Sequence, residues 1–127
     1  MTEADIQKDI LTRLFNRGWV AIRFNSGTSK TSGGNFLRSY WIAGMDVQPS
    51  AGLPDVIAFK DGKHLLLEVK NEKGKLSDAQ KRFQSVAARR GETVHVVRSW
   101  EEVEQIVNTI TNEESCLNTP QTNKSSV

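Results

Sequence analysis

The sequence predicts an α/β domain in which a small mixed β-sheet is flanked by α-helices. Two observations lead to this fold class. Apolar residues recur at helical spacing near the start of the chain, between residues 78 and 90, and again after residue 99. Between the first two of these segments, residues 55–70 read as two β-strands joined by the turn Asp61-Gly62. The order helix, strand, hairpin, helix, strand, helix is typical of a sheet covered by helices.

Length and composition limit the classes of protein that the chain can belong to. Its 127 residues suit one domain with a real core, and a net charge of +2 neither requires nor excludes a polyanionic partner. Cys116 is the only cysteine, which excludes an internal disulfide and a thiolate zinc cluster and suits a reducing compartment. The first five residues have neither a basic start nor an apolar run, so we expect a cytoplasmic protein without a membrane segment.

The first 52 residues predict a helix, a strand and two irregular stretches. Thr2 caps the helix and Gly18 ends it, while one apolar stripe is expected from Ile6, Ile10, Leu11, Leu14 and Phe15. The alternation of Val20, Ile22 and Phe24 with Ala21 and Arg23 predicts a strand over residues 19–25. Residues 26–35 are small, polar and glycine-rich and predict a mobile loop. Residues 36–42 are ambiguous between a short strand and irregular structure, and an excursion is expected over 43–52.

The second half predicts two further helices around one more strand. Ser77 caps a helix over residues 78–90, whose buried stripe is Ala79, Phe83, Val86 and Ala87. Residues 93–97 form a strand. A capping box at Ser99 then begins a last helix, whose apolar face is Val103, Ile106, Val107 and Ile110. We therefore expect one domain over residues 1–111 and a disordered polar tail over 112–127.

The hairpin brings three charged residues to one place. If Asp61-Gly62 is a two-residue loop, Lys60 faces Lys63, and counting outward places Asp55 opposite Glu68. Opposed residues project from one face of a sheet with Cβ atoms roughly 5 Å apart. Because strand residues alternate between faces, Lys70 joins the face of Glu68. Two carboxylates and an ammonium group thus converge at one end of an apolar hairpin.

This convergence predicts metal-dependent chemistry. Opposed carboxylates repel, and a divalent cation relieves the repulsion, since carboxylate oxygens, a backbone carbonyl and waters are the ligands of Mg²⁺. Such an ion activates a water and holds a phosphate oxygen, while Lys70 offsets charge on the phosphate or orients the water. The predicted reaction is hydrolysis of a phosphodiester. Taken singly, each residue also fits a solvated strand end or an ordinary turn.

A family resemblance follows from the same residues and their context. Pro54-Asp55, twelve residues, and Glu68-Val69-Lys70 resemble the signature of the PD-(D/E)XK nuclease superfamily. A first helix that begins with Glu3 and Gln7, the run Gly52-Leu53-Pro54-Asp55, and residues 76–83 (Leu-Ser-Asp-Ala-Gln-Lys-Arg-Phe) make the chain similar to the virus-type replication-repair nuclease (VRR-NUC) family in its stand-alone form. The resemblance covers Glu3 to about Ile110.

The resemblance implies a fold, an activity and a partner. It implies a restriction-endonuclease-like α/β core, dependence on Mg²⁺ or Mn²⁺, and structure-selective cleavage of DNA. Stand-alone members look like homodimeric Holliday-junction resolvases, often carried by phages or prophages. The residues that match the family's site are Asp55 and Glu68 as metal ligands, Val69 through its backbone carbonyl, Lys70 as the catalytic lysine, Gln80 on the following helix, and Glu3 as the acidic residue of the first helix.

Gln80 and Glu3 each have an alternative role that the sequence supplies. Ser77-x-x-Gln80 is a capping box, in which Gln80 bonds back to the Ser77 backbone. Glu3 fits ordinary complementation of the helix dipole in a first turn. His64 is expected to be exposed beside the turn and His95 to be structural, because neither has a metal-ligand neighbour at helical spacing.

Contacts with DNA and with a second subunit are expected from segments that adjoin the hairpin. The candidate phosphate-binding residues are Lys30, Arg38, Lys73, Lys75, Lys81 and Arg82. Tyr40 and Trp41 fit base stacking, core packing or a subunit contact. The surplus apolar surface for a two-fold dimer is Phe36, Leu37, Tyr40, Trp41, Ile42 and Met45. Two alternatives to junction resolution stay open, a nuclease for flapped, nicked or duplex DNA and a DNA-binding module that does not cleave.

Overall fold

A computed structural model gives the fold, and it describes residues 1–24, 29–30, 36–37, 43 and 52–117. In chain order the elements are α1 (Glu3–Asn16), β1 (Val20–Arg23), β2 (Ser29–Lys30), β3 (Phe36–Leu37), β4 (Val56–Lys60), β5 (Lys63–Val69), α2 (Asp78–Arg89), β6 (Val94–Val97) and α3 (Trp100–Leu117). Four strands form one sheet in the order β1-β4-β5-β6, and β2 pairs with β3 separately. The β5–β6 pair is parallel and the others are antiparallel, which confirms the predicted mixed sheet.

The central hairpin has the predicted turn and register. Lys60 pairs with Lys63, and the ladder continues to the pair Val56 and Leu67. Asp61 and Gly62 have φ angles of +52° and +80°. Both central residues of a type I′ turn need positive φ, and Asp-Gly is a preferred sequence for it. Asp55 and Glu68 are the residues directly beyond the last recorded pair.

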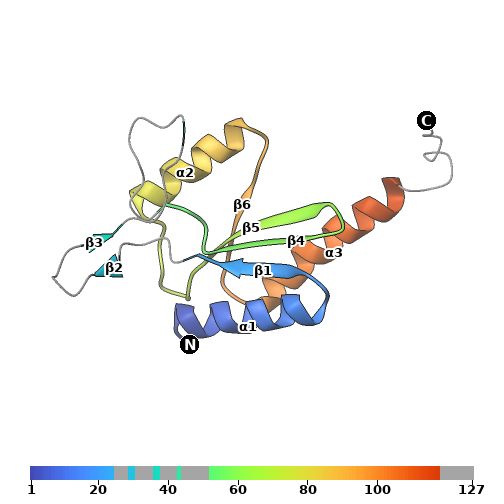
Figure 1. The fold of residues 1–127 in the computed structure, drawn as a ribbon, viewed down its shortest axis with the longest axis horizontal. Helices are drawn as coiled ribbons and strands as arrows, with labels where there is room; N and C mark the ends of the chain where they lie inside the picture. The colour runs from blue at the N-terminus through green and yellow to red at the C-terminus, as the bar shows by residue number, and fades with distance from the viewer. Residues whose placement is uncertain (25–28, 31–35, 38–42, 44–51, 118–127) are drawn as a thin grey trace.

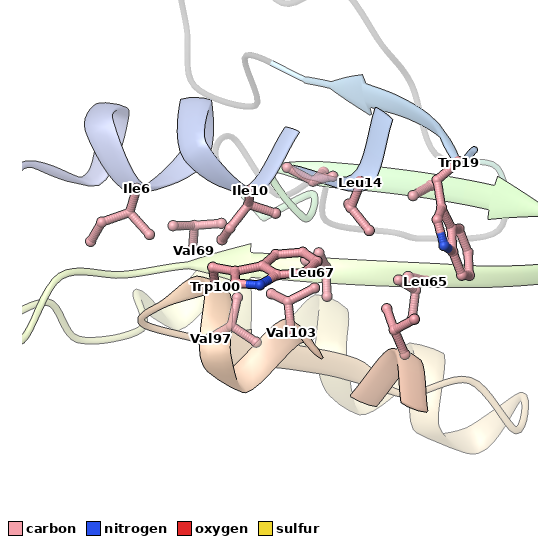
Figure 2. Close-up of a cluster of buried hydrophobic side chains, with 13 residues drawn as sticks. Ile6, Ile10, Leu14, Trp19, Leu65, Leu67, Val69, Val97, Trp100 and Val103 are labelled. Atoms are coloured by element: carbon pink, nitrogen blue, oxygen red, sulfur yellow. The ribbon is translucent and has the colours of Figure 1, made fainter. Parts of the chain in front are cut away.

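The core lies between one face of the sheet and the two terminal helices. Leu65, Leu67 and Val69 alternate along β5 and face this side, where they meet Ile10 of α1 and Val103 of α3 (Figure 2). The buried apolar side chains of this core are Ile6, Ile10, Leu14, Trp19, Val56, Ala58, Leu65, Leu67, Val69, Val97, Trp100, Val103 and Val107. In Figure 1, α2 lies on the side of the sheet opposite α1. The sheet is therefore the middle layer.

One expectation about an apolar face near the N-terminus is wrong. Phe15 is 74% exposed and does not join the stripe of α1. On β1 the outward side chains are Val20 and Ile22, 49% and 39% exposed, whereas Ala21 packs against the core. The cause is the position of α1, which lies over the side of β1 that carries the small residue. A bulkier side chain at this side would hold the helix further from the sheet.

The first two helix starts are as expected, and the last helix is longer. Thr2 caps α1, with its hydroxyl accepting from the Asp5 N–H at 3.1 Å. α3 continues to Leu117, so residues 112–117 of the expected tail are helical. Residues 118–127 lie outside the described part of the chain. So do residues 38–42 and 44–51, and with them Arg38, Tyr40, Trp41, Ile42 and Met45.

Between residues 26 and 37 the structure describes only the short β2–β3 ribbon. Phe36 and Leu37 form β3 and pair with Lys30 and Ser29, which supports the strand alternative for the start of 36–42. It also places two strand residues inside the expected loop over 26–35. Within the described ranges, no helix has the length and apolar character needed to cross a lipid bilayer.

Candidate active site

Asp55, directly before β4, is held by hydrogen bonds to the ends of the neighbouring strands β1 and β5. Its carboxylate oxygen Oδ2 accepts from the Val69 backbone N–H at 2.7 Å, and its backbone carbonyl accepts from the Phe24 N–H at 2.7 Å. Asp55 therefore joins the end of β5 to the end of β1. The side chain stays half-buried, with access to solvent. This geometry leaves Asp55 anchored through one carboxylate oxygen.

Glu68 is a buried carboxyl group at the centre of the site. It is 1% exposed, and its Oε2 accepts from Gln80 Nε2 at 2.8 Å. Lys70 Nζ lies 3.8 Å from the same oxygen. Burial, the neighbouring Asp55 and, more weakly, Glu3 raise the pKa of Glu68 to about 9, and Lys70 opposes this shift. Without a cation, Glu68 thus holds a proton at neutral pH.

Gln80 forms the predicted capping box and also contacts Glu68. Its Oε1 accepts from the Ser77 N–H at 2.8 Å and the Ser77 hydroxyl accepts from the Gln80 N–H at 3.1 Å, which completes the capping box. Its Nε2 is then left to donate to Glu68. One buried amide joins the start of α2 to the carboxyl group on β5 because a primary amide has a separate acceptor and donor.

Lys70 is held at the end of β5 by the neighbouring parallel strand. Its backbone N–H donates to the Val97 carbonyl at 3.0 Å, and the residue is 8% exposed. The recorded partner of its Nζ is Glu68 Oε2, the same oxygen that accepts from Gln80. The structure thus brings together Asp55, Glu68, Lys70 and Gln80 from β4, β5 and α2.

Glu3 lies beside this cluster rather than within it. It is half-buried at the start of α1, and its charge contributes to the raised pKa of Glu68. Among the residues that the structure describes, no three histidine, cysteine, aspartate or glutamate side chains gather in a metal-binding arrangement. The capping box of α1 uses Asp5, so Glu3 is not needed for it. A direct role of Glu3 in metal binding remains a prediction, as does that of the Val69 carbonyl.

The residues at this end of the hairpin fit a divalent cation. Glu68 Oε1 is buried and has no hydrogen-bond partner. An unpartnered buried oxygen is costly, and a metal ion would satisfy it. One carboxylate oxygen on each of two strands, with waters and a phosphate oxygen, is a ligand set that Mg²⁺ takes. A bound cation would also lower the raised pKa of Glu68, because its positive charge favours the ionised carboxylate.

The basic residues expected at the DNA are partly located. Lys73 and Lys75 are exposed in the loop between β5 and α2, and Lys81 and Arg82 are exposed on α2. All four positions follow Lys70 in the chain, in the loop after β5 and on α2. Lys30 is described only by its place in β2, and Arg38 lies outside the described residues.

The sequence analysis did not predict a contact that joins Arg98 to Asn71 and Gly74 of the loop after β5. Arg98, directly after β6, donates through Nη1 to the Gly74 carbonyl at 3.1 Å and to the Asn71 carbonyl. The Asn71 side chain accepts from the Lys73 N–H at 3.1 Å. Asn and Gly in a short polar segment indicate a turn, but no local pattern connects this turn with Arg98.

The two histidines lie where the sequence placed them. His64 is exposed next to the turn, with Nε2 2.7 Å from Glu92 Oε1. His95 is half-buried on β6, and burial lowers its pKa. Neither belongs to the cluster around Glu68.

Comparisons with known proteins concern the same region of the chain. A model of the VRR-NUC domain family matches residues 1–101. A solved structure of a VRR-NUC domain has 22% identity and a TM-score of 0.57, over 85% of this chain and 97% of that chain. The structure of Hjc from Archaeoglobus fulgidus, a Holliday junction resolvase from an archaeal hyperthermophile, has 24% identity and a TM-score of 0.44, over 76% of this chain and 67% of that chain. A search of curated proteins gave no match.

Proposed function

Because this chain belongs to the VRR-NUC domain family of PD-(D/E)XK nucleases, we propose that it is a metal-dependent, structure-selective DNA endonuclease. The observation that supports this most directly is the buried Glu68, which has one carboxyl oxygen without a partner and the Asp55 carboxylate as a neighbour. The proposed substrate is a four-way DNA junction, cut by a homodimer that acts on two strands related by symmetry.

Each residue of the cluster has a defined role in this proposal. Asp55 and Glu68 hold Mg²⁺ or Mn²⁺, which when bound supplies an activated water and stabilises charge on the phosphate. Gln80 keeps Glu68 in place through its amide donor. Lys70 donates to the scissile phosphate or orients the water. Hydrolysis forms a P–O bond to the water oxygen and breaks the bond to the leaving sugar oxygen, which takes up a proton.

The test is cleavage of a synthetic four-way junction with Mg²⁺ or Mn²⁺. We expect Asp55→Asn and Lys70→Ala each to lower the rate at least about 100-fold, because each removes a group that acts on the reacting phosphate. The matched controls are Asp61→Asn and Lys63→Ala, which make the same changes at the opposite end of the hairpin. Asn also tolerates the positive φ at position 61. Equal rates in all five proteins would refute the assigned roles.

The same preparation separates the alternative functions. Flapped, nicked and linear duplex DNA, assayed beside the junction, identify the preferred structure. Light scattering gives the oligomeric state, and a monomer at micromolar concentration would count against junction resolution by a dimer. Calorimetry that detects no Mn²⁺ binding would instead favour a DNA-binding module that does not cleave.

A further inference from the structure

We propose that Gly74 is a positioning residue of the candidate active site, where its bare backbone, held by Arg98, gives the Glu3 carboxylate its place beside Lys70. The proposal rests on the function proposed above, since it gives Glu3 a part in metal-dependent cleavage. It assigns a role to a loop glycine that no part of the catalytic motif contains.

The close approach of Glu3 is the main evidence. A Cβ atom added at Gly74 would lie 2.6 Å from Glu3 Oε2, closer than the 3.0 Å that real Cβ atoms respect. It would also lie 3.2 Å from Lys70 Cδ and 3.2 Å from Asn71 Oδ1. The Glu3 carboxylate and the Lys70 side chain therefore meet at the surface of Gly74. Only glycine leaves room for both.

The backbone at Gly74 is held in place, so it does not yield to an added side chain. The Gly74 N–H donates to the Asn71 carbonyl at 3.1 Å and closes a turn. Arg98 Nη1 donates to the Gly74 carbonyl at 3.1 Å and to the Asn71 carbonyl. Lys70, at the start of this loop, is bonded to Val97 of β6. The loop is thus tied to the sheet on both sides of the turn.

The need for glycine at this position comes from the contact, not from the backbone angles. Gly62 and Gly91 have φ angles of +80° and +83°, and an added Cβ there meets no atom within 4 Å. Gly74 differs from these two glycines in both respects, because its φ lies outside the left-handed range and an added Cβ would meet close neighbours. The crowding atom is the end of a flexible, half-buried side chain. An alanine at 74 would therefore displace the Glu3 carboxylate at little cost to the fold.

The position of Glu3 gives it an electrostatic role. Glu3 Oε2 and Lys70 Cδ lie 2.6 Å and 3.2 Å from the position of a Cβ atom added at Gly74, so the carboxylate lies beside the Lys70 side chain. A further carboxylate at this end of the hairpin favours the binding of a divalent cation. Displacement of Glu3 should lower metal affinity without removing a metal ligand from β4 or β5.

The experiment is a double-mutant cycle of Gly74→Ala and Glu3→Ala in the full chain. Mn²⁺ binding is measured by calorimetry, four-way-junction cleavage by rate, and stability by thermal unfolding. We expect each single variant to bind Mn²⁺ about tenfold more weakly, as for other groups that orient a metal site. The double variant should bind no more weakly than either. The Tm of Gly74→Ala should stay within about 3 °C of the wild type, whereas the control Gly91→Ala should lose stability and keep its Mn²⁺ affinity.

The outcomes distinguish this proposal from the proposed function. The positioning role would be overturned if Gly74→Ala kept the Mn²⁺ affinity and cleavage rate of the wild type. It would also be overturned if the losses of affinity in the two single variants added in the double variant, since Gly74 would then act independently of Glu3. If the wild type neither binds Mn²⁺ nor cleaves DNA, the proposed function fails. Thermal unfolding then tests the contact between Gly74 and the Glu3 carboxylate. Gly74→Ala should then be better tolerated in the Glu3→Ala background. Equal shifts in both backgrounds would overturn the positioning role.

Discussion

Replacement of Glu68 by glutamine should stabilise the metal-free protein at alkaline pH. Glutamine keeps the shape of the protonated carboxyl group, so its oxygen can still accept from Gln80 Nε2. The pKa of Glu68 is raised from 4.5 to about 9 in the folded state. A raised pKa means that the stabilisation from this group is complete below pH 4.5 and is lost as the pH rises toward 9.

The magnitude follows from this shift. Between pH 4.5 and 9 the free energy of unfolding of the wild type falls by up to about 1.4 kcal/mol per pH unit relative to Glu68→Gln. At pH 8 the full shift sets an upper limit of about 5 kcal/mol, and relaxation of the site with entry of water reduces this to roughly 2–3 kcal/mol. That difference corresponds to a Tm higher by roughly 8 °C for a domain of this size. Near pH 5 it should shrink below about 1 kcal/mol.

The assay is thermal unfolding followed by circular dichroism in EDTA from pH 5 to pH 9. Glu72→Gln, at an exposed position of the loop after β5, is the control and should follow the wild type at every pH. Saturating Mn²⁺ should then stabilise the wild type, by about 2.7 kcal/mol at 100 times the dissociation constant, but not Glu68→Gln. A difference between wild type and Glu68→Gln that does not change with pH would refute the reasoning that Glu68 is a buried, neutral carboxyl group.

Two further predictions concern the core and the amide that joins α2 to the site. Leu67→Ala should lower the free energy of unfolding by about 2–5 kcal/mol in urea titrations, because Leu67 is 0% exposed, and a loss below about 1 kcal/mol would contradict this position. Gln80→Ala and Ser77→Ala should each cost about 1 kcal/mol through the lost cap, but only Gln80→Ala should also slow junction cleavage, since Ser77→Ala keeps the donor to Glu68.

The hairpin could be predicted in detail because its information is local. Asp61-Gly62 sets a turn of two residues, and the period of two along each strand then fixes every pair up to Val56 and Leu67, next to Asp55 and Glu68. The caps Thr2 and Ser77 were predictable for the same reason, since donor and acceptor lie within three residues. These elements needed no knowledge of the rest of the fold.

The failed expectations depend on packing between distant segments. Apolar periodicity placed Phe15 in the buried stripe of the first helix, but periodicity alone does not say how far around the helix the buried face extends. The last helix continues to Leu117, past Ile110, which is the last residue of its predicted apolar face. Residues 111–117 have no apolar pattern at helical spacing, so periodicity did not extend the predicted helix over them.

The sequence by itself determined which residues meet at the end of the hairpin, namely Asp55, Glu68 and Lys70, because turn length and strand alternation fix their relative positions. Tertiary structure decided the chemical state of that cluster. The burial of Glu68, the donor from Gln80 and the approach of Glu3 over Gly74 all come from α1, α2 and the loop held by Arg98. A pKa depends on every charge and dipole nearby in space, and the chain brings these together only when it folds.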